Sequence, residues 1–177
     1  MGVGYFVDAC RSCESCSSGH ENYCPELVLA SNGVDRDGAA TMGGFSDAVV
    51  VSQDFVVRVP DNLPADATAP LLCAGVTVYS SMVQFALNEP GKRLGVVGLG
   101  GLGHLAVKFG KAFGLTVTVI SSSPGKREEA LGRLGADAFL VSQDAAQMKV
   151  TIAQCRRRHI LCVVCANLHC WHAGGNA

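Results

Sequence analysis

Residues 94–103 read Leu-Gly-Val-Val-Gly-Leu-Gly-Gly-Leu-Gly and decide the fold. Residues 94–98 form a short apolar run that predicts a buried strand of a parallel sheet. The run leads into a complete G-x-G-x-x-G over residues 98–103. In this motif the first glycine permits a tight turn, the second lets the backbone approach a pyrophosphate, and the third lets helix and strand pack closely. The stretch therefore predicts the first strand, turn and helix of a dinucleotide-binding domain.

The residues that follow extend this pattern. Apolar side chains recur at helical spacing after the turn, and Gly114 ends the expected helix. Residues 116–120 are β-branched and apolar and predict a second strand, residues 125–134 a second helix, and residues 138–141 a third strand. The order β-α-β-α-β is half of a doubly wound sheet. His104, at the start of the first helix, is expected to be a packed or solvated histidine rather than a ligand.

The residues after the second strand bear on the choice of cofactor. NAD-binding proteins normally carry Asp or Glu there to hold the ribose 2′-hydroxyl. This chain has Ser121, Ser122 and Ser123, followed by Lys126 and Arg127. Hydroxyl donors and cations without an acid favour a 2′-phosphate, so NADP(H) is predicted over NAD(H). A plain helix N-cap with a solvated basic pair is the alternative, and both interpretations are compatible.

Four cysteines near the start of the chain have metal-ligand spacing. Cys10, Cys13, Cys16 and Cys24 stand as C-x2-C-x2-C-x7-C. Two-residue gaps let a turning loop direct several thiolates at one ion, and a fourth thiolate closes a tetrahedron. The alternatives are a redox pair or chance clustering, but redox pairs usually open a helix in a βαβ context and none follows here. The spacing predicts a structural Zn²⁺ site.

The composition excludes several classes of protein. The 177 residues are 49% hydrophobic and 16% charged, with 21 glycines, which excludes a disordered chain or a coiled coil. A net charge of -1 gives no sign of a nucleic-acid or membrane-surface partner. No apolar run approaches the ~20 residues that a membrane helix needs, and no secretory signal is visible. We expect a soluble cytoplasmic protein.

The last part of the chain has a different composition. Residues 145–177 contain four basic residues and no acid, with four of the nine cysteines. A second metal site is one interpretation, and a shifted frame or retained intron is the other. The spacing C-x6-C-x2-C-x4-C is not a standard zinc pattern, which favours the latter. The residues concerned are Cys155, Cys162, Cys165, Cys170, His159, His169 and His172.

Three further stretches carry a family resemblance. They read Asp-Ala-Cys-Arg-Ser-Cys-Glu-Ser-Cys over 8–16, Pro-Leu-Leu-Cys-Ala-Gly-Val-Thr-Val-Tyr over 70–79, and Val-Ile-Ser-Ser-Ser-Pro over 119–124. With the glycine-rich turn, they make roughly residues 1–150 similar to the zinc-dependent medium-chain alcohol dehydrogenases, and most to plant cinnamyl alcohol dehydrogenases. The resemblance implies an α/β fold: a partial Rossmann-type, doubly wound parallel sheet preceded by part of a β-rich GroES-like catalytic domain.

The resemblance also implies domain boundaries. Residues 1–60 would belong to the GroES-like domain, with the zinc lobe at about 5–30. Residues 61–90 would form a helical connection and residues 91–150 the NADP-binding half-domain. Residues 151–177 would be a divergent tail outside the fold.

Members of this family reduce cinnamaldehydes to cinnamyl alcohols with NADPH toward lignin, and a catalytic zinc polarises the carbonyl. They form homodimers. The resemblance assigns Cys10, Cys13, Cys16 and Cys24 to the structural zinc and Cys73 to the catalytic zinc. It assigns to the cofactor Thr77, Gly98, Leu99, Gly100, Gly101, Leu102, Gly103, Ser121, Ser122, Ser123 and Lys126.

The chain departs from the family in two respects. The other catalytic ligands, a Cys and a His, come from a segment of about ninety residues that precedes the matched part in family members, so we expect this chain alone to be inactive. Leu29 stands where lignin-pathway members tend to carry a substrate-lining Trp. The rival interpretation is a non-catalytic zinc-binding module or interaction fragment.

Overall fold

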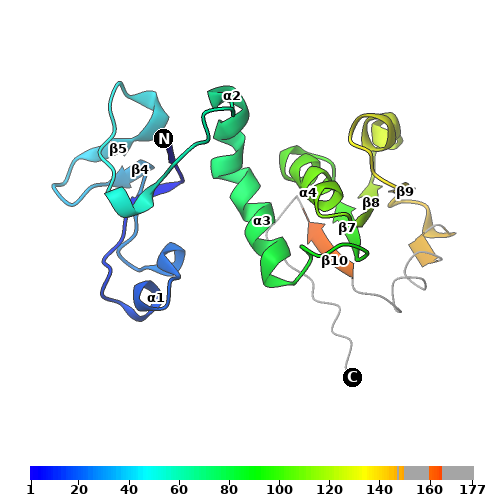
Figure 1. Ribbon diagram of the computed structural model, residues 1–177, viewed down its shortest axis with the longest axis horizontal. Coiled ribbons are helices and arrows are strands. Elements are labelled where there is room, and N and C mark those ends of the chain that lie inside the picture. The colour runs from blue at the N-terminus through cyan, green and yellow to red at the C-terminus, as the bar shows by residue number, and fades with distance from the viewer. Residues whose placement is uncertain (147, 150–159, 165–177) are drawn as a thin grey trace. The chain divides into compact units, whose positions relative to one another are not determined.

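The computed structural model describes residues 1–146, 148–149 and 160–164, the last group by its backbone course. The chain divides into two compact units, Met1–Cys73 and Ala74–Ala177 (Figure 1). Among the described residues there is no helix long and apolar enough to cross a membrane.

The first unit is built from short antiparallel strand pairs. Strand β1 (Gly2–Val3) pairs with β6 (Val56–Val57), β2 (Phe6–Asp8) with β3 (Val28–Leu29), and β4 (Ser31–Val34) with β5 (Ala40–Met42). The helical segments are short: α1 (Glu14–Ser17), α2 (Ala65–Thr68) and 3-10 turns at Glu21–Tyr23, Gly43–Phe45, Gln53–Phe55 and Ala69–Leu72. The β-rich character expected of this part is confirmed.

The buried apolar core of this unit is small. Its members are Val7, Ala9, Cys24 and Val28, and Phe6 adds an edge-to-face contact with Phe55 at 5.1 Å between ring centroids. So few buried side chains contribute little hydrophobic stabilisation to the loop between β2 and β3. The stability of that loop therefore depends on interactions among its own residues.

The second unit contains the parallel sheet. Its elements are α3 (Ala74–Gln84), β7 (Arg93–Val97), α4 (Gly101–Ala112), β8 (Thr116–Ser121), a 3-10 turn (Pro124–Lys126), a π-helical turn (Glu129–Arg133), β9 (Ala138–Val141) and β10 (Ile160–Val164). The strand order is β10-β7-β8-β9, and each neighbouring pair is parallel. The predicted α/β class with a partial parallel sheet is confirmed.

The core of this unit lies between the sheet and its helices. Val96 of β7 faces Val119 of β8 in the register, and both side chains are fully buried. Ala106 and Val107 of α4 are buried in the same cluster. Four larger apolar side chains of this segment pack around the cluster while staying partly exposed: Leu102, Leu105, Phe109 and Phe113.

Two segments of this unit differ from the sequence prediction. The expected helix over 125–134 begins as a 3-10 turn at Pro124 and becomes a π-helical turn, because Leu134 N–H donates to the Glu129 carbonyl five residues earlier at 3.0 Å. The tail was expected to lie outside the fold, yet β10 adds a fourth strand beside β7. Ile160–Val164 is a short apolar, β-branched run, which suits the open edge of a parallel sheet.

Candidate metal centre and dinucleotide site

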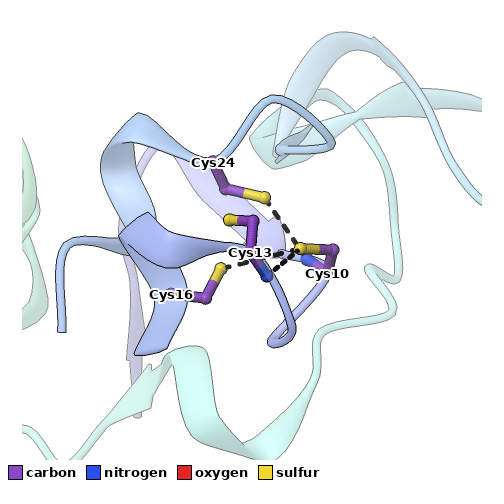
Figure 2. Close-up of side chains that lie close together, drawn as sticks. All are labelled: Cys10, Cys13, Cys16 and Cys24. Atoms are coloured by element: carbon purple, nitrogen blue, oxygen red, sulfur yellow. Dashed lines mark hydrogen bonds between the residues drawn. The ribbon is translucent and has the colours of Figure 1, made fainter. Parts of the chain in front are cut away.

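The four cysteine sulfurs near the start of the chain converge on one point. They all lie within 4.8 Å of one another, and Cys10 Sγ is 3.9 Å from Cys16 Sγ. Figure 2 shows the four labelled side chains gathered around one point. A tetrahedral zinc with Zn–S bonds of about 2.3 Å holds its sulfurs about 3.8 Å apart. The cluster therefore has the dimensions of a zinc site, and its donor set suits that ion.

The local backbone explains how four thiols come together. Arg11 adopts a left-handed conformation (φ 60°), which turns the chain between Cys10 and Cys13. Cys13 is the N-cap residue of α1, and Cys16 lies within that helix. Gly19, also left-handed at φ 74°, turns the chain back toward Cys24. Each turn thus brings a further sulfur to the cluster.

Backbone N–H groups surround two of the sulfurs. Ser12 N and Cys13 N donate to Cys10 Sγ at 3.5 and 3.3 Å. Cys10 N and Glu26 N donate to Cys24 Sγ at 3.4 and 3.3 Å. Such donors stabilise negative charge on sulfur and orient metal ligands.

Two thiols of the cluster have shifted acidity. The backbone donor at Ser12, followed by that at Cys13, lowers the pKa of Cys10 to about 6. Burial, followed by the neighbouring Cys13 thiol, raises the pKa of Cys16 to about 12. Thiols this close cannot all ionise unless a cation joins them. A closed set of four thiolates leaves no position for water, so a metal here would stabilise the loop without catalysing a reaction.

Ion pairs fasten this loop to the rest of its unit. Asp8 accepts a hydrogen bond from Arg36 Nε at 2.5 Å and forms an ion pair with Arg11 at 2.9 Å. Arg11 also contacts Asp54 at 3.0 Å and lies over the Phe55 ring. Burial raises the pKa of Asp8, but the bonds from Arg36 and the Ala9 backbone outweigh it and lower the pKa overall. The carboxylate thus stays ionised between the two guanidinium groups.

The other predicted metal ligand lies elsewhere. Cys73 follows the 3-10 turn Ala69–Leu72 and is exposed. Within the described ranges, the one group of three or more close metal-ligating side chains is the four-cysteine cluster, and Cys73 is not part of it. Thr77, expected near the cofactor, is exposed on α3. The tail histidines and Cys155, Cys165 and Cys170 lie outside the described residues, as does the side chain of Cys162.

The glycine-rich turn lies at the carboxyl end of β7 and leads into α4. Gly98 has φ +87°, and its N–H donates to the Ile120 carbonyl of β8 at 2.8 Å. A methyl group on Gly103 would lie 2.1 Å from the Gly98 carbonyl oxygen, so helix and turn meet at van der Waals distance. Around Gly100 and Gly101 a methyl group would meet no atom within 4 Å. This open side, at a helix N-terminus, suits an approaching pyrophosphate.

The serine-rich segment follows at the carboxyl end of β8. Ser121 is buried, and its Oγ accepts the N–H of Ser123 at 3.2 Å. Ser122 and Ser123 are exposed. Lys126 Nζ donates to the Leu99 carbonyl at 2.6 Å, which joins this segment to the glycine-rich turn. The structure thus brings together the two sets of residues predicted to bind a dinucleotide.

Sequence reasoning missed one pair at this site. His104 Nε2 lies 3.0 Å from Glu129 Oε1, and its Nδ1 lies 2.7 Å from the Gly100 carbonyl oxygen. The spacing of four residues between Gly100 and His104 was a possible signal. Glu129 lies 25 residues further along the chain, and nothing in the sequence indicated its contact with His104.

Comparison with known proteins gives one consistent result. Residues 2–61 match the family model of the alcohol dehydrogenase GroES-like domain. A probable cinnamyl alcohol dehydrogenase 8D of Oryza sativa subsp. japonica is 71% identical over 153 residues, which is 86% of this chain. A solved cinnamyl alcohol dehydrogenase from Sorghum bicolor is 81% identical over 84% of this chain, with a TM-score of 0.80.

A second solved structure is a cinnamyl alcohol dehydrogenase from Helicobacter pylori complexed with NADP(H). It is 38% identical over 79% of this chain, with a TM-score of 0.72. The chain spans only about two fifths of its relatives' length: 42% of the rice protein, 43% of the Sorghum chain and 40% of the Helicobacter chain.

Proposed function

This chain is cinnamyl alcohol dehydrogenase-like and part of the medium-chain zinc alcohol dehydrogenase family, and on that premise we propose that it serves NADPH-dependent reduction of cinnamaldehyde-type aldehydes. The similarity to the rice and Sorghum proteins over about 150 residues carries this proposal. The family-model match over residues 2–61 contains the cysteine lobe, and the 153-residue match to the rice protein extends through the glycine-rich turn. The proposed place of action is the cytoplasm.

Two cofactors have proposed places in these residues. Cys10, Cys13, Cys16 and Cys24 hold a structural zinc, as the spacing of their sulfurs supports. NADP(H) lies over the glycine-rich turn, with Gly100 and Gly101 at its pyrophosphate. Its 2′-phosphate is bound by the exposed Ser122 and Ser123 and by Lys126, while the buried Ser121 supports their loop.

NADPH supplies the hydride when it is bound, and the described residues bind and orient it. Of the catalytic zinc ligands that the family uses, this chain contributes Cys73. A catalytic zinc needs three protein ligands, and one thiolate does not hold the ion. The 177 residues alone are therefore expected to bind NADPH without reducing an aldehyde.

A titration of the purified chain with NADPH and with NADH, followed by cofactor fluorescence, tests the proposal. NADPH should bind at least about tenfold more tightly, a difference of about 1.4 kcal/mol that one charge-assisted phosphate contact supplies. Equal affinities would refute the assignment of the 2′-phosphate site. Turnover of cinnamaldehyde by the chain alone would refute the expected inactivity.

The rival function is a non-catalytic zinc-binding module or interaction fragment. A protein with this rival function would also bind zinc at the four cysteines, but it would have no affinity for a nucleotide. Zinc binding together with failure to bind either NADPH or NADH would favour this rival.

A further inference from the structure

Two consecutive carbonyl groups of the glycine-rich turn are held by side chains from outside the turn. Lys126 Nζ donates to the Leu99 oxygen at 2.6 Å. The Gly100 oxygen accepts twice from His104, from its backbone N–H at 2.9 Å and from its ring Nδ1 at 2.7 Å. Both carbonyls are thus fixed in direction.

Fixing a carbonyl also fixes the next N–H along the chain. The peptide group is planar and trans, so its C=O and N–H point in opposite directions. The Leu99 oxygen shares a peptide group with Gly100 N–H, and the Gly100 oxygen shares one with Gly101 N–H. Both of these glycines border the open side of the turn. The side-chain contacts therefore aim two N–H groups at the space proposed for the pyrophosphate.

The His104 ring is held at both ends. Its Nδ1 lies 2.7 Å from the Gly100 carbonyl oxygen, a group that can only accept a hydrogen bond. Its Nε2 faces Glu129 Oε1 at 3.0 Å. The hydrogen bond from His104 lowers the pKa of Glu129, and Arg133 and Lys126 are the further cations that face this carboxylate. The imidazolium form of His104 carries a proton on each ring nitrogen and can donate to the Gly100 oxygen and to Glu129 at once, which fixes the plane of the ring and keeps Nδ1 against the turn.

The geometry points to His104, held by Glu129, as a positioning residue that orients Gly101 N–H for the pyrophosphate of NADP(H), with Lys126 doing the same for Gly100 N–H. This inference rests on the proposed function. Neither His104 nor Glu129 needs to touch the nucleotide. Their removal weakens ligands that contain a pyrophosphate and leaves adenosine 2′-monophosphate, which has no phosphate at its 5′ position, unaffected.

The test compares variants of the whole chain by titration with NADPH and with adenosine 2′-monophosphate. His104→Leu removes both ring contacts, and His104→Asn keeps an N–H near the position of Nδ1. Lys111→Gln is the matched control, because Lys111 and Asp137 form a similarly exposed pair at 2.7 Å at the other end of α4.

His104→Leu should bind NADPH at least about tenfold more weakly and the monophosphate within about twofold of wild type, since the ring no longer holds Gly101 N–H toward a phosphate. His104→Asn should recover most of the NADPH affinity, and Lys111→Gln should match wild type for both ligands. Unchanged NADPH affinity in His104→Leu, or equal loss of both ligands, would overturn the inference.

An NMR spectrum of the protein without nucleotide tests the role of His104 independently of the proposed function. The amide resonances of Gly100 and Gly101 in the ligand-free protein report the orientation of the turn. His104→Leu should shift the Gly101 resonance, and Lys111→Gln should leave it in place. Failure of the wild-type chain to bind NADPH would refute the proposed function and the named ligand together, while an unmoved Gly101 resonance would refute the role of His104 by itself.

Discussion

The tight approach of α4 to its preceding turn gives a sharp prediction for Gly103→Ala. The added methyl group would lie 2.1 Å from the Gly98 carbonyl oxygen, and that neighbour is backbone, which cannot rotate away. To reach an ordinary contact of 3.4 Å, helix and turn must separate by about 1.3 Å. Overpacking of this kind costs about 2–3 kcal/mol. For a chain of this size that lowers the unfolding temperature by roughly 4–12 °C.

Gly101→Ala is the matched control, two positions away in the same helix. Its methyl group meets no atom within 4 Å, and alanine favours a helix by about 0.5–1 kcal/mol over glycine. The variant should therefore be at least as stable as wild type. Its methyl group would occupy the space proposed for the pyrophosphate, so NADPH affinity should fall at least about tenfold.

Thermal unfolding by circular dichroism, together with NADPH titration, measures both effects. The expected pattern is opposite for the two variants: Gly103→Ala loses stability, and Gly101→Ala loses affinity alone. Equal stability of the two variants would refute the close packing of turn and helix. Wild-type NADPH affinity in Gly101→Ala would refute the placement of the pyrophosphate.

Three further predictions concern the cofactor, pH and metal. Ser122→Asp places a carboxylate directly after β8, where it would repel a 2′-phosphate. In competition titrations the affinity for NADPH should fall at least about tenfold and the affinity for NADH should rise. An unchanged preference between the two cofactors would contradict the 2′-phosphate site. The hydrogen bond from His104 lowers the pKa of Glu129 below 4.5. The contribution of this pair to the free energy of unfolding is therefore full above pH 4.5 and is lost as the pH falls through the lowered folded-state pKa. The urea midpoints of wild type and Glu129→Gln should converge there, and a constant difference down to the acid transition would refute the pair. Chelation of zinc should expose the loop over residues 10–24 to protease. The affinity for NADPH should persist, since the glycine-rich turn belongs to the other unit. An unchanged cleavage pattern after chelation would argue against a structural metal.

The sheet of the second unit could be predicted closely from the sequence. Residues 94–98, 116–120 and 138–141 were expected as strands and appear as β7, β8 and β9 with shifts of one residue at most. Each is an apolar or β-branched run bounded by turn residues, so local pattern suffices. The convergence of the four cysteines also follows from spacing alone, because two-residue gaps in a turning loop leave few other arrangements.

The features that sequence could not predict depend on contacts distant in the chain. β10 pairs with β7 across more than sixty residues, and nothing in Ile160–Val164 specifies that neighbour. The contact of His104 with Glu129 likewise depends on how the turn at Pro124 redirects the chain. The burial of Ser121 follows from its register in β8, where alternate side chains face inward.

The content of zinc per chain, measured by metal analysis on freshly purified and chelator-washed protein, tests the account most directly. The account predicts a value near one in wild type and near zero in Cys16→Ser, because the four described thiols form a single closed site. A wild-type value near zero would contradict the structural zinc site proposed for the four cysteines. A value near two would show that a second site exists, and the expected inactivity of the chain would then have to be tested again by turnover of cinnamaldehyde.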